Sequence, residues 1–548
     1  MIYLSALLLS FFTTVVLIPV FSRGALRFNI GLDMPEVRKI HKEPIPRVGG
    51  IAITLGVFMS TVLWLPQSSF TLAYGIGAAV ILLFGMLDDF KGLGFKIKFL
   101  AQIAAAVIVA MYGDVRIRSL GGLLPDGLLL PDAISIPLTV VAIVGVTNAI
   151  NLSDGLDGLA GGICLLCFSC LGYLAYIGEN VTLCLLGLAL VGSIMGFLRY
   201  NTYPAELFLG DTGSQFLGFS AITVSLSLTQ QQTTALSPLL PLLILGFPVL
   251  DTLAVMAQRF AEGRPLFSAD QNHFHHRLMG LGLHHSESVF AIYLLQSLLV
   301  IGAYFFRFYQ EWLILSVYVT LSAAIIVGFH IADKTRWRLG RHDFLEYLIK
   351  GRIERMRNEG TFIRVSFRAI RFGLPLLLLI TCFVPSKIPT HFGLLSVVLL
   401  CLLGGIWVFK RAWIRLGFVV SLYLFIPLIV YLSTETERSM GDVLPVLYGA
   451  AFIGIIVFSV FTLKLTKRKR GFKSTPMDFL ILFMAVVFPY LLATYLPVKG
   501  LPIIVAKTIM FFFGYEVVMG ELRGKLDALV LASMPSLLAA AARGLSGW

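Results

Sequence analysis

The sequence predicts an all-α, polytopic membrane protein, and two observations carry this prediction. Of the 548 residues, 57% are hydrophobic and only 13% are charged, a balance that no single water-soluble core could bury. Apolar stretches of about 17 to 25 residues, long enough to cross a bilayer as helices, recur from one end to the other, and we count about sixteen. The first, 2–21, lacks a basic leader and a cleavage site, so we expect a retained membrane helix and not a signal peptide.

The net charge of +13 indicates membrane topology and not a nucleic-acid partner, because Lys and Arg gather in short loops between apolar spans. Cytoplasmic loops of membrane proteins carry such an excess. The basic loops are 38–47, 91–98, 259–277, 334–371, 410–415 and 464–473. Alternating spans place all of them on one side. We therefore expect a multi-pass protein of the inner (plasma) membrane, with its N-terminus outside and its polar motifs facing the cytoplasm.

The order of the spans predicts three segments. Residues 1–306 hold about ten spans, with polar residues concentrated in the cytoplasmic loops, and form the expected functional core. Residues 307–372 add one span and a strongly basic linker, and residues 373–548 add about five to six spans of unknown function. The six cysteines all lie in apolar stretches, so we expect small hydrophobic residues and no metal site there.

Two groups of acids and amides stand at predicted cytoplasmic ends of spans. Asp88 and Asp89 end the third span, where adjacent carboxylates favour a cation, although a solvated helix end explains the pair more simply. The second group is spaced three residues apart, so that neighbours share a helix face: Asn148, Asn151, Asp154 and Asp157. Glycines within 155–162 permit either close approach of a ligand or tight helix packing, and both uses stay open.

Two further cytoplasmic loops carry charged side chains. In the loop 201–214, Asp211 stands between glycines at the start of the eighth span, where capping of the helix and metal binding both stay open. The loop 259–276 supplies donors suited to phosphate oxygens: Arg259, Arg264, His273, His275 and His276. A zinc site is the competing interpretation of the histidines, and it is disfavoured because no Cys lies nearby and the arginines repel a dication. Together the four loops describe a magnesium–phosphate site.

In this order along the chain, the motifs closely resemble those of the polyprenyl-phosphate N-acetylhexosamine-1-phosphate transferases of glycosyltransferase family 4. The matching motifs are Arg-Lys-Ile-His-Lys-Glu-Pro-Ile-Pro-Arg-Val-Gly-Gly at 38–50, Asp-Asp at 88–89, Asn-Leu-Ser-Asp-Gly-Leu-Asp-Gly at 151–158, Phe-Leu-Gly-Asp-Thr-Gly-Ser at 208–214 and the histidine cluster. The resemblance covers about residues 1–306 and leaves the rest of the chain unexplained.

The resemblance implies roles for individual residues. Magnesium, for which manganese is an expected substitute, would be bound by Asp211 and Asp154. The residues implied in catalysis are Asp88, Asp89, Asp211 and His273. The residues implied in substrate binding are Lys42, Lys98, Asn151, Asp154, Asp157, Asn201, Phe208, Arg259, Arg264, His275 and His276.

The activity that the resemblance implies is transfer of an N-acetylhexosamine 1-phosphate from a UDP-sugar to undecaprenyl phosphate. UMP is released, and the product starts a cell-envelope polysaccharide in cell wall biogenesis. Phe274 separates His273 from His275, which resembles the branch that uses UDP-N-acetylglucosamine more than the branch with three contiguous histidines. A homodimer is expected by the same resemblance.

Two alternatives to this activity stay open. The alternative enzyme is the transferase that uses the muramoyl-pentapeptide nucleotide, to which the contiguous histidines belong. The alternative from another class is a lipid-linked sugar transporter. We disfavour the transporter because the charge clusters of this sequence lie in loops and not at the middle of the membrane.

Overall fold

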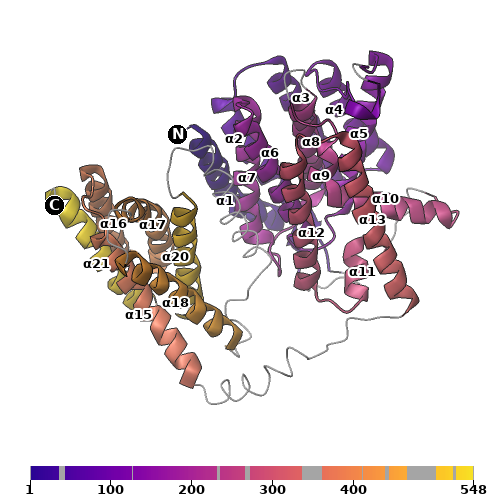
Figure 1. The fold of residues 1–548 in the computed structure, drawn as a ribbon. Coiled ribbons are helices and arrows are strands. Elements are labelled where there is room, and N and C mark those ends of the chain that lie inside the picture. Colours follow the sequence, from indigo (N-terminus) through magenta and orange to yellow (C-terminus); the bar gives the residue numbers. More distant parts are fainter. Residues whose placement is uncertain are drawn as a thin grey trace. The chain divides into compact units, whose positions relative to one another are not determined.

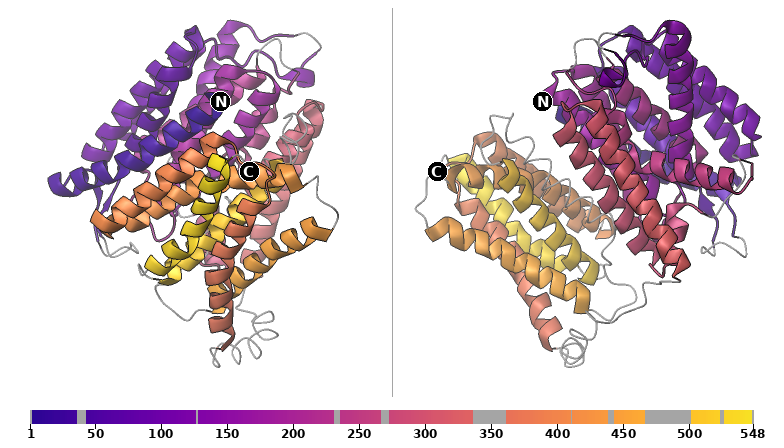
Figure 2. Two further views of the ribbon diagram at one scale, coloured as in Figure 1. Left: turned by 90° about the vertical axis from the view of Figure 1, so that its left-hand side faces the viewer. Right: turned by 45° about the vertical axis from the view of Figure 1, so that its right-hand side comes forward.

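The computed structural model describes residues 2–35, 43–125, 128–230, 235–265, 272–335, 361–409, 411–437, 443–465, 501–522 and 526–546. These residues form two compact units, the first from the described residues up to 335 and the second from those after 361 (Figure 1, Figure 2). Eleven of the described helices are long and apolar enough to cross a bilayer. The predicted all-α, multi-pass class is therefore confirmed.

The first unit is a bundle of helices with a single pair of very short strands. Its helices are α1 (Ile2–Phe28), α2 (Gly49–Trp64), α3 (Ser69–Lys91), α4 (Phe95–Met111), α5 (Asp132–Leu152), α6 (Leu159–Ile177), α7 (Val181–Asn201), α8 (Gly210–Thr229), α9 (Leu240–Ile244), α10 (Gly246–Ala261), α11 (Phe274–Gly280), α12 (His285–Phe306) and α13 (Glu311–Lys334), with a 3-10 turn η1 (Gly121–Leu123). α6 and α8 are buried along almost their whole length. A helix that is apolar all round belongs in such a core, and α7 and α8 connect it to the outer helices α1, α3 and α5.

The short strands fix the segment that enters α2. β1 (Leu32–Asp33) pairs antiparallel with β2 (Ile45–Pro46), and Arg47 forms an ion pair with the buried Asp33. The backbone N–H of Phe208 then donates to the carbonyl oxygen of Pro46 at 2.8 Å, and Gly49 N–H donates to the carbonyl oxygen of Phe208 at 3.0 Å. Two motifs more than 150 residues apart are thus joined through backbone hydrogen bonds.

A break at Leu245 divides one membrane helix into α9 and α10, and Figure 1 shows α10 projecting from the bundle. Gln296 of α12 donates to the carbonyl oxygen of Ile244 at 2.7 Å and accepts from the N–H of Phe247 at 3.2 Å. Tyr318 of α13 donates to the carbonyl oxygen of Gly246 at 2.9 Å. These side chains satisfy backbone groups that would be costly to leave unpaired at membrane depth.

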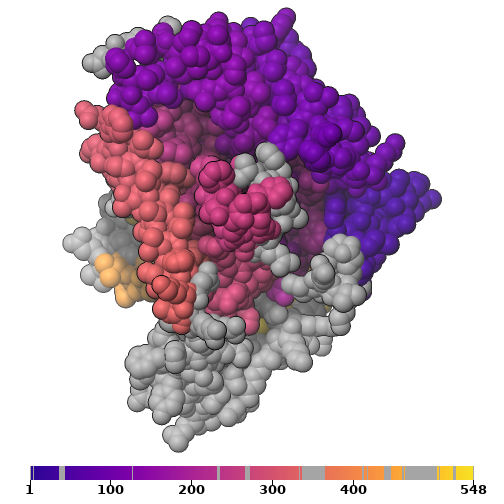
Figure 3. Space-filling view, turned by 90° about the vertical axis from the view of Figure 1, so that its right-hand side faces the viewer, coloured from indigo at the N-terminus to yellow at the C-terminus, as the bar shows by residue number. Residues whose placement is uncertain are grey.

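α13 is the extra span that the sequence places within 307–372, and it belongs to the first unit. Figure 3 shows it along the surface of that unit, where Val319 and Val327 are each more than half exposed. Exposed apolar side chains on a membrane helix are suited to contact with lipid. Most of the predicted basic linker lies outside the described residues.

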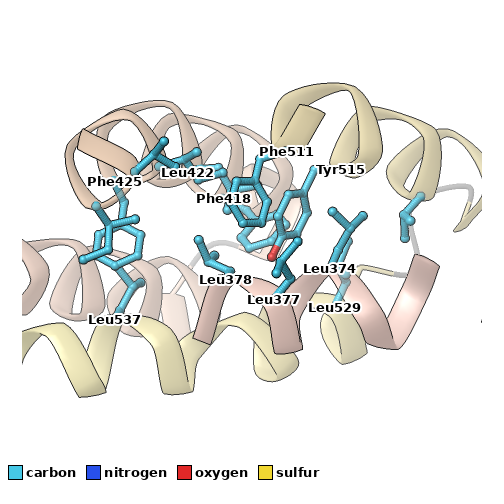
Figure 4. Close-up of a cluster of buried hydrophobic side chains, with 14 of the residues drawn as sticks. Leu374, Leu377, Leu378, Phe418, Leu422, Phe425, Phe511, Tyr515, Leu529 and Leu537 are labelled. Atoms are coloured by element: carbon cyan, nitrogen blue, oxygen red, sulfur yellow. The ribbon is translucent and has the colours of Figure 1, made fainter. Parts of the chain in front are cut away.

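The second unit has its own hydrophobic core. Its helices are α15 (Thr361–Phe383), α16 (Thr390–Phe409), α17 (Ile414–Glu437), α18 (Val443–Leu465), α20 (Leu501–Leu522) and α21 (Asp527–Ser546), with a 3-10 turn η2 (Arg411–Trp413). Figure 4 shows Leu377 of α15, Phe418 of α17, Tyr515 of α20 and Leu537 of α21 meeting in this core. The last of these helices, α21, is long and apolar enough to span a bilayer.

Candidate active site

Four helices of the first unit bring polar side chains together at one end of the bundle. Asp88 lies in the last turn of α3 and Asn151 in the last turn of α5, whereas Lys98 lies near the start of α4 and Asp211 at the start of α8. Helices that alternate in direction present the end of one beside the start of the next. Residues that are far apart in the sequence therefore meet at one edge of the membrane-spanning bundle.

Lys98 is the centre of this group. Its ammonium forms an ion pair with Asp88 and lies 3.3 Å from Asp211 Oδ2. Asn151 Nδ2 donates to the other oxygen of Asp211, Oδ1, at 2.7 Å. Asp88 is buried, and its Oδ1 accepts a hydrogen bond from the backbone N–H of Leu93 at 2.6 Å. One cation thus contacts two convergent carboxylates, an arrangement suited to holding phosphate groups and cations.

Asp89 has different contacts from its neighbour Asp88. Its Oδ1 accepts a hydrogen bond from the backbone N–H of Asp211 at 2.9 Å, and its Oδ2 accepts from the N–H and the hydroxyl of Thr212 at 3.0 and 2.6 Å. Asp89 therefore caps the start of α8 from another helix. The carboxylate of Asp211 does not cap the helix and instead contacts Lys98 and Asn151.

The prediction that the four residues spaced by three share one helix face is wrong for half of them. α5 ends at Leu152 and α6 begins at Leu159, so Asp154 and Asp157 lie in the loop between these helices. Gly158, the residue before α6, has a φ of +81°, a conformation that glycine adopts without strain.

Asp157 and Asn201 organise the neighbouring loops. Asp157 Oδ2 accepts a hydrogen bond from the N–H of Ala205 at 3.0 Å, and Asn201 Oδ1 accepts from the N–H of Gly158 at 2.9 Å. Asn201 also donates to the carbonyl oxygen of Leu207 at 2.9 Å. The contacts join the loop after α7 to the loop before α6, and thereby hold the segment that carries Phe208 and Asp211.

Asp154 is affected by the negative charges of three other acids, Asp211, Asp89 and Asp157. No described residue donates a hydrogen bond to its carboxyl group, and burial, together with the negative charge of Asp211, raises its pKa to about 7. Among the described residues no three His, Cys, Asp or Glu side chains form a ready-made metal cage. Mg²⁺ commonly uses only one or two carboxylates with phosphate oxygens and water. The pair Asp154 and Asp211 fits that donor set.

The histidine segment, residues 273–276, lies beside the loop that carries Asp154. A Cβ placed on Gly155 would lie 2.3 Å from His275 Nε2, so the His275 ring packs directly on this glycine. Burial and the positive charge of neighbouring His276 lower the pKa of His275 to about 4, and the ring is therefore neutral at pH 7. His273 and His275 are buried, whereas His276 is exposed.

Three of the remaining predicted site residues have other contacts or positions, and one lies outside the part of the chain that the structure describes. Arg259 is buried near the end of α10, and Arg264 pairs with Glu262 at 3.1 Å. Phe208 contributes its backbone to the contact with Pro46. Lys42, a predicted substrate ligand, lies outside the described residues.

Sequence reasoning missed three buried polar residues, Asp251, Gln102 and Gln215. Asp251 of α10 accepts hydrogen bonds from the His273 ring and from the N–H of Phe274 at 2.9 and 2.8 Å. Below Lys98, Gln102 donates to Gln215 at 3.1 Å and accepts from Asn148 at 2.7 Å. A polar residue inside an apolar span is a signal of function or of helix association, and it was available for all of them.

Comparisons with known proteins identify chains that are similar to this one. Residues 71–229 match the family model described as glycosyl transferase family 4. The chain is 36% identical over 316 residues to a probable undecaprenyl-phosphate N-acetylglucosaminyl 1-phosphate transferase of Bacillus subtilis (strain 168), covering 57% of this chain and 87% of the relative. It is 30% identical over 361 residues to the undecaprenyl-phosphate alpha-N-acetylglucosaminyl 1-phosphate transferase of Escherichia coli (strain K12), covering 64% and 95%.

Proposed function

Since this chain belongs to glycosyl transferase family 4, as a phosphotransferase of the membrane, we propose that it transfers N-acetylglucosamine 1-phosphate from UDP-N-acetylglucosamine to undecaprenyl phosphate and releases UMP. The names of these relatives support this donor group and this lipid acceptor. The product would start a cell-envelope polysaccharide. The proposed location is the inner membrane, with the site on the cytoplasmic side, where the basic loops of the sequence are expected.

The observation that carries the proposal is the contact of Lys98 with both Asp88 and Asp211. Transfer of a phosphoryl group depends mainly on positioning the reactants and on neutralising their charge. An ammonium between two carboxylates is held in place before any substrate arrives. Lys98 can then turn its remaining hydrogen-bond donors toward phosphate oxygens at the helix ends.

The proposed reaction is a displacement at phosphorus. An oxygen of the lipid phosphate attacks the phosphorus that carries the sugar, a new P–O bond forms, and the P–O bond to UMP breaks with its electron pair leaving on UMP. The second pKa of a phosphate monoester is near 6, so the attacking group is largely dianionic at neutral pH. Asp88 is therefore not required as a general base, and its role is to orient Lys98.

Asp211 and Asp154 are the proposed magnesium ligands. Mg²⁺ held there would place positive charge on the phosphate oxygens of the donor, and Mn²⁺ is an expected substitute. Asn151, which donates to Asp211 Oδ1, would hold this carboxylate in place for the metal. The support for this pair is the position of the Asp154 carboxyl group near Asp211. No described residue donates a hydrogen bond to the Asp154 carboxyl group.

The proposed sugar rests on the histidine segment. Phe274 is buried and packs edge-on against Phe247 and Phe329, with ring centroids 5.8 and 5.0 Å apart. Its insertion turns the flanking His273 and His275 onto one side, with parallel rings 5.9 Å apart. We propose that this arrangement suits a compact donor such as UDP-N-acetylglucosamine. The muramoyl-pentapeptide nucleotide remains the alternative donor.

The test is UMP release by the purified, full-length protein with undecaprenyl phosphate and magnesium. The donors are UDP-N-acetylglucosamine, UDP-N-acetylgalactosamine and the muramoyl-pentapeptide nucleotide. We expect lipid-dependent UMP from the first donor, and its loss on chelation with EDTA and in Asp211→Asn. Lipid-dependent UMP from the pentapeptide nucleotide alone would replace the proposed donor, and no UMP from any donor would contradict the proposed function.

A further inference from the structure

Asp251 is a buried acid in an otherwise apolar part of α10, with only 1% of its surface exposed. Its Oδ1 accepts a hydrogen bond from the backbone N–H of Phe274 at 2.8 Å, and its Oδ2 lies 2.9 Å from His273 Nδ1. An acid is rarely buried so completely without a partner. Asp251 has two partners, and both belong to the first residues of the histidine segment.

The groups on both sides of this contact are fixed by packing. The start of α10 is held by Gln296 and Tyr318 across the break at Leu245. On the other side, the Phe274 ring is enclosed by Phe247 and Phe329. Asp251 and His273 therefore meet in a rigid frame, which is the requirement for a side chain that must hold a precise ring orientation.

The contact also determines where the imidazole carries its proton. An ionised carboxylate only accepts hydrogen bonds, so Nδ1 of His273 must be the protonated ring nitrogen that donates to Asp251. Nε2 is then the nitrogen left for other partners. The neighbouring His275 ring lies parallel to His273 and rests on Gly155, beside Asp154. The fixed ring is thus connected to the loop that carries the proposed metal ligand.

We propose that Asp251 is a positioning residue for the sugar-phosphate transfer, which acts by fixing the tautomer and the ring orientation of His273 so that the unprotonated Nε2 accepts a hydrogen bond from an O–H or N–H group of the donor's N-acetylhexosamine. This inference rests on the proposed function. It assigns to a membrane helix a polar residue that the charged loops of the sequence do not reveal. It also assigns a role to the break between α9 and α10, because the break determines the position of Asp251.

The substitution Asp251→Asn separates this role from mere capping of α11. The Phe274 N–H needs an acceptor, so the amide oxygen of Asn must face it and the amide NH₂ must face His273. A donor opposite Nδ1 requires that nitrogen to accept, which moves the ring proton to Nε2. The shape and the helix cap are preserved while the tautomer is reversed. The matched control is Glu311→Gln at the start of α13. Glu311 also accepts two hydrogen bonds, from Gly122 N–H and from the Ser237 hydroxyl.

The experiment measures kcat and the KM for UDP-N-acetylglucosamine in the wild type, Asp251→Asn, His273→Gln, the double variant and Glu311→Gln. We expect Asp251→Asn to lower kcat on the order of 100-fold, with KM changed less than about threefold and the thermal unfolding midpoint retained. The double variant should be no slower than His273→Gln, because Asp251 acts through that ring. Glu311→Gln should match the wild type.

Three results would overturn the inference. One is an Asp251→Asn enzyme with wild-type kcat, and another is a double variant in which the two losses multiply. If Asp251→Asn does not fold, His273→Gln decides alone, since an unchanged kcat in that variant removes the ring through which Asp251 must act. A wild type that releases no UMP contradicts the proposed function and the inference with it, whereas an active wild type with an equally active Asp251→Asn contradicts the inference alone.

Discussion

The carboxylate of Asp89 accepts a hydrogen bond of 2.9 Å from the backbone N–H of Asp211, whose own carboxylate faces Lys98. Two adjacent acids on α3 are therefore divided between two tasks. Asp88 takes part in the charged group with Lys98, and Asp89 fixes the start of the helix that supplies Asp211. An acid beside a helix N-terminus is stabilising because it satisfies backbone donors and faces the positive end of the helix dipole.

Asp89→Ala is expected to lower the free energy of unfolding by about 1 to 2 kcal/mol, the cost of losing a helix cap. Activity should fall as well, because the start of α8 would no longer hold Asp211 in place. Thermal unfolding and UMP release measure the two effects. Asp88→Asn is the comparison, and it should lower activity with the smaller loss of stability. An unchanged unfolding midpoint in Asp89→Ala would contradict the assigned capping role.

Lys98→Met should reduce kcat by roughly 100-fold or more, because it removes the cation that lies between Asp88 and Asp211. Methionine keeps the length and the apolar stem of lysine. Lys96→Met is the matched control, since Lys96 lies two residues away on α4 and is exposed. The measurement is the steady-state rate of UMP release by both variants. Equal rates in the two variants would mean that the cation is not used.

Gly155→Ala and Gly145→Ala should have opposite effects on stability. A Cβ on Gly155 would lie 2.3 Å from His275 Nε2, whereas a Cβ on Gly145 meets nothing within 4 Å. The first substitution must displace a buried ring, at a cost of about 1 to 3 kcal/mol. The second should stabilise α5 by roughly 0.5 to 1 kcal/mol, since alanine favours a helix. Thermal midpoints that move together would show that His275 does not rest on Gly155.

The neutral His275 predicts a pH dependence of stability. Its folded-state pKa of about 4 is below its ordinary value of 6.5, so the stabilisation is fully present above pH 6.5 and is lost as the pH falls toward 4. The full loss amounts to about 3 kcal/mol. The raised pKa of Asp154 acts in the opposite direction over a similar range. The measurement is therefore the difference between the wild type and His275→Gln in the slope of unfolding free energy against pH, and identical slopes would contradict the prediction.

Much of the fold could be predicted because a bilayer allows few solutions. The long apolar stretches that predict membrane helices reappear as α1, α3 and α5, among others. The meeting of Asp88, Lys98 and Asp211 also follows from the sequence in outline, because alternating spans return every second loop to the same side. The sequence therefore predicts directly which helix ends lie on the same side of the membrane.

Other features depend on contacts that the sequence does not display. Asp88 and Asp89 are the same residue type at adjacent positions, and only the approach of α8 gives them different partners. The loop at 153–158 was expected to continue a helix because residue spacing does not reveal that α5 ends at Leu152. Asp251 does not stand out in the sequence, because it is a single buried acid within α10 and not part of a loop with several charges.

The most direct test of the account follows a phosphorus label. UDP-N-acetylglucosamine carrying ³²P in its β-phosphate, the one bonded to the sugar, is incubated with the protein, magnesium and undecaprenyl phosphate, and the lipid is extracted. Transfer of the sugar 1-phosphate predicts that the label enters the lipid fraction, in equal amount to the UMP released, and that Lys98→Met abolishes both. Label that remains in UDP while the sugar reaches the lipid would contradict the account.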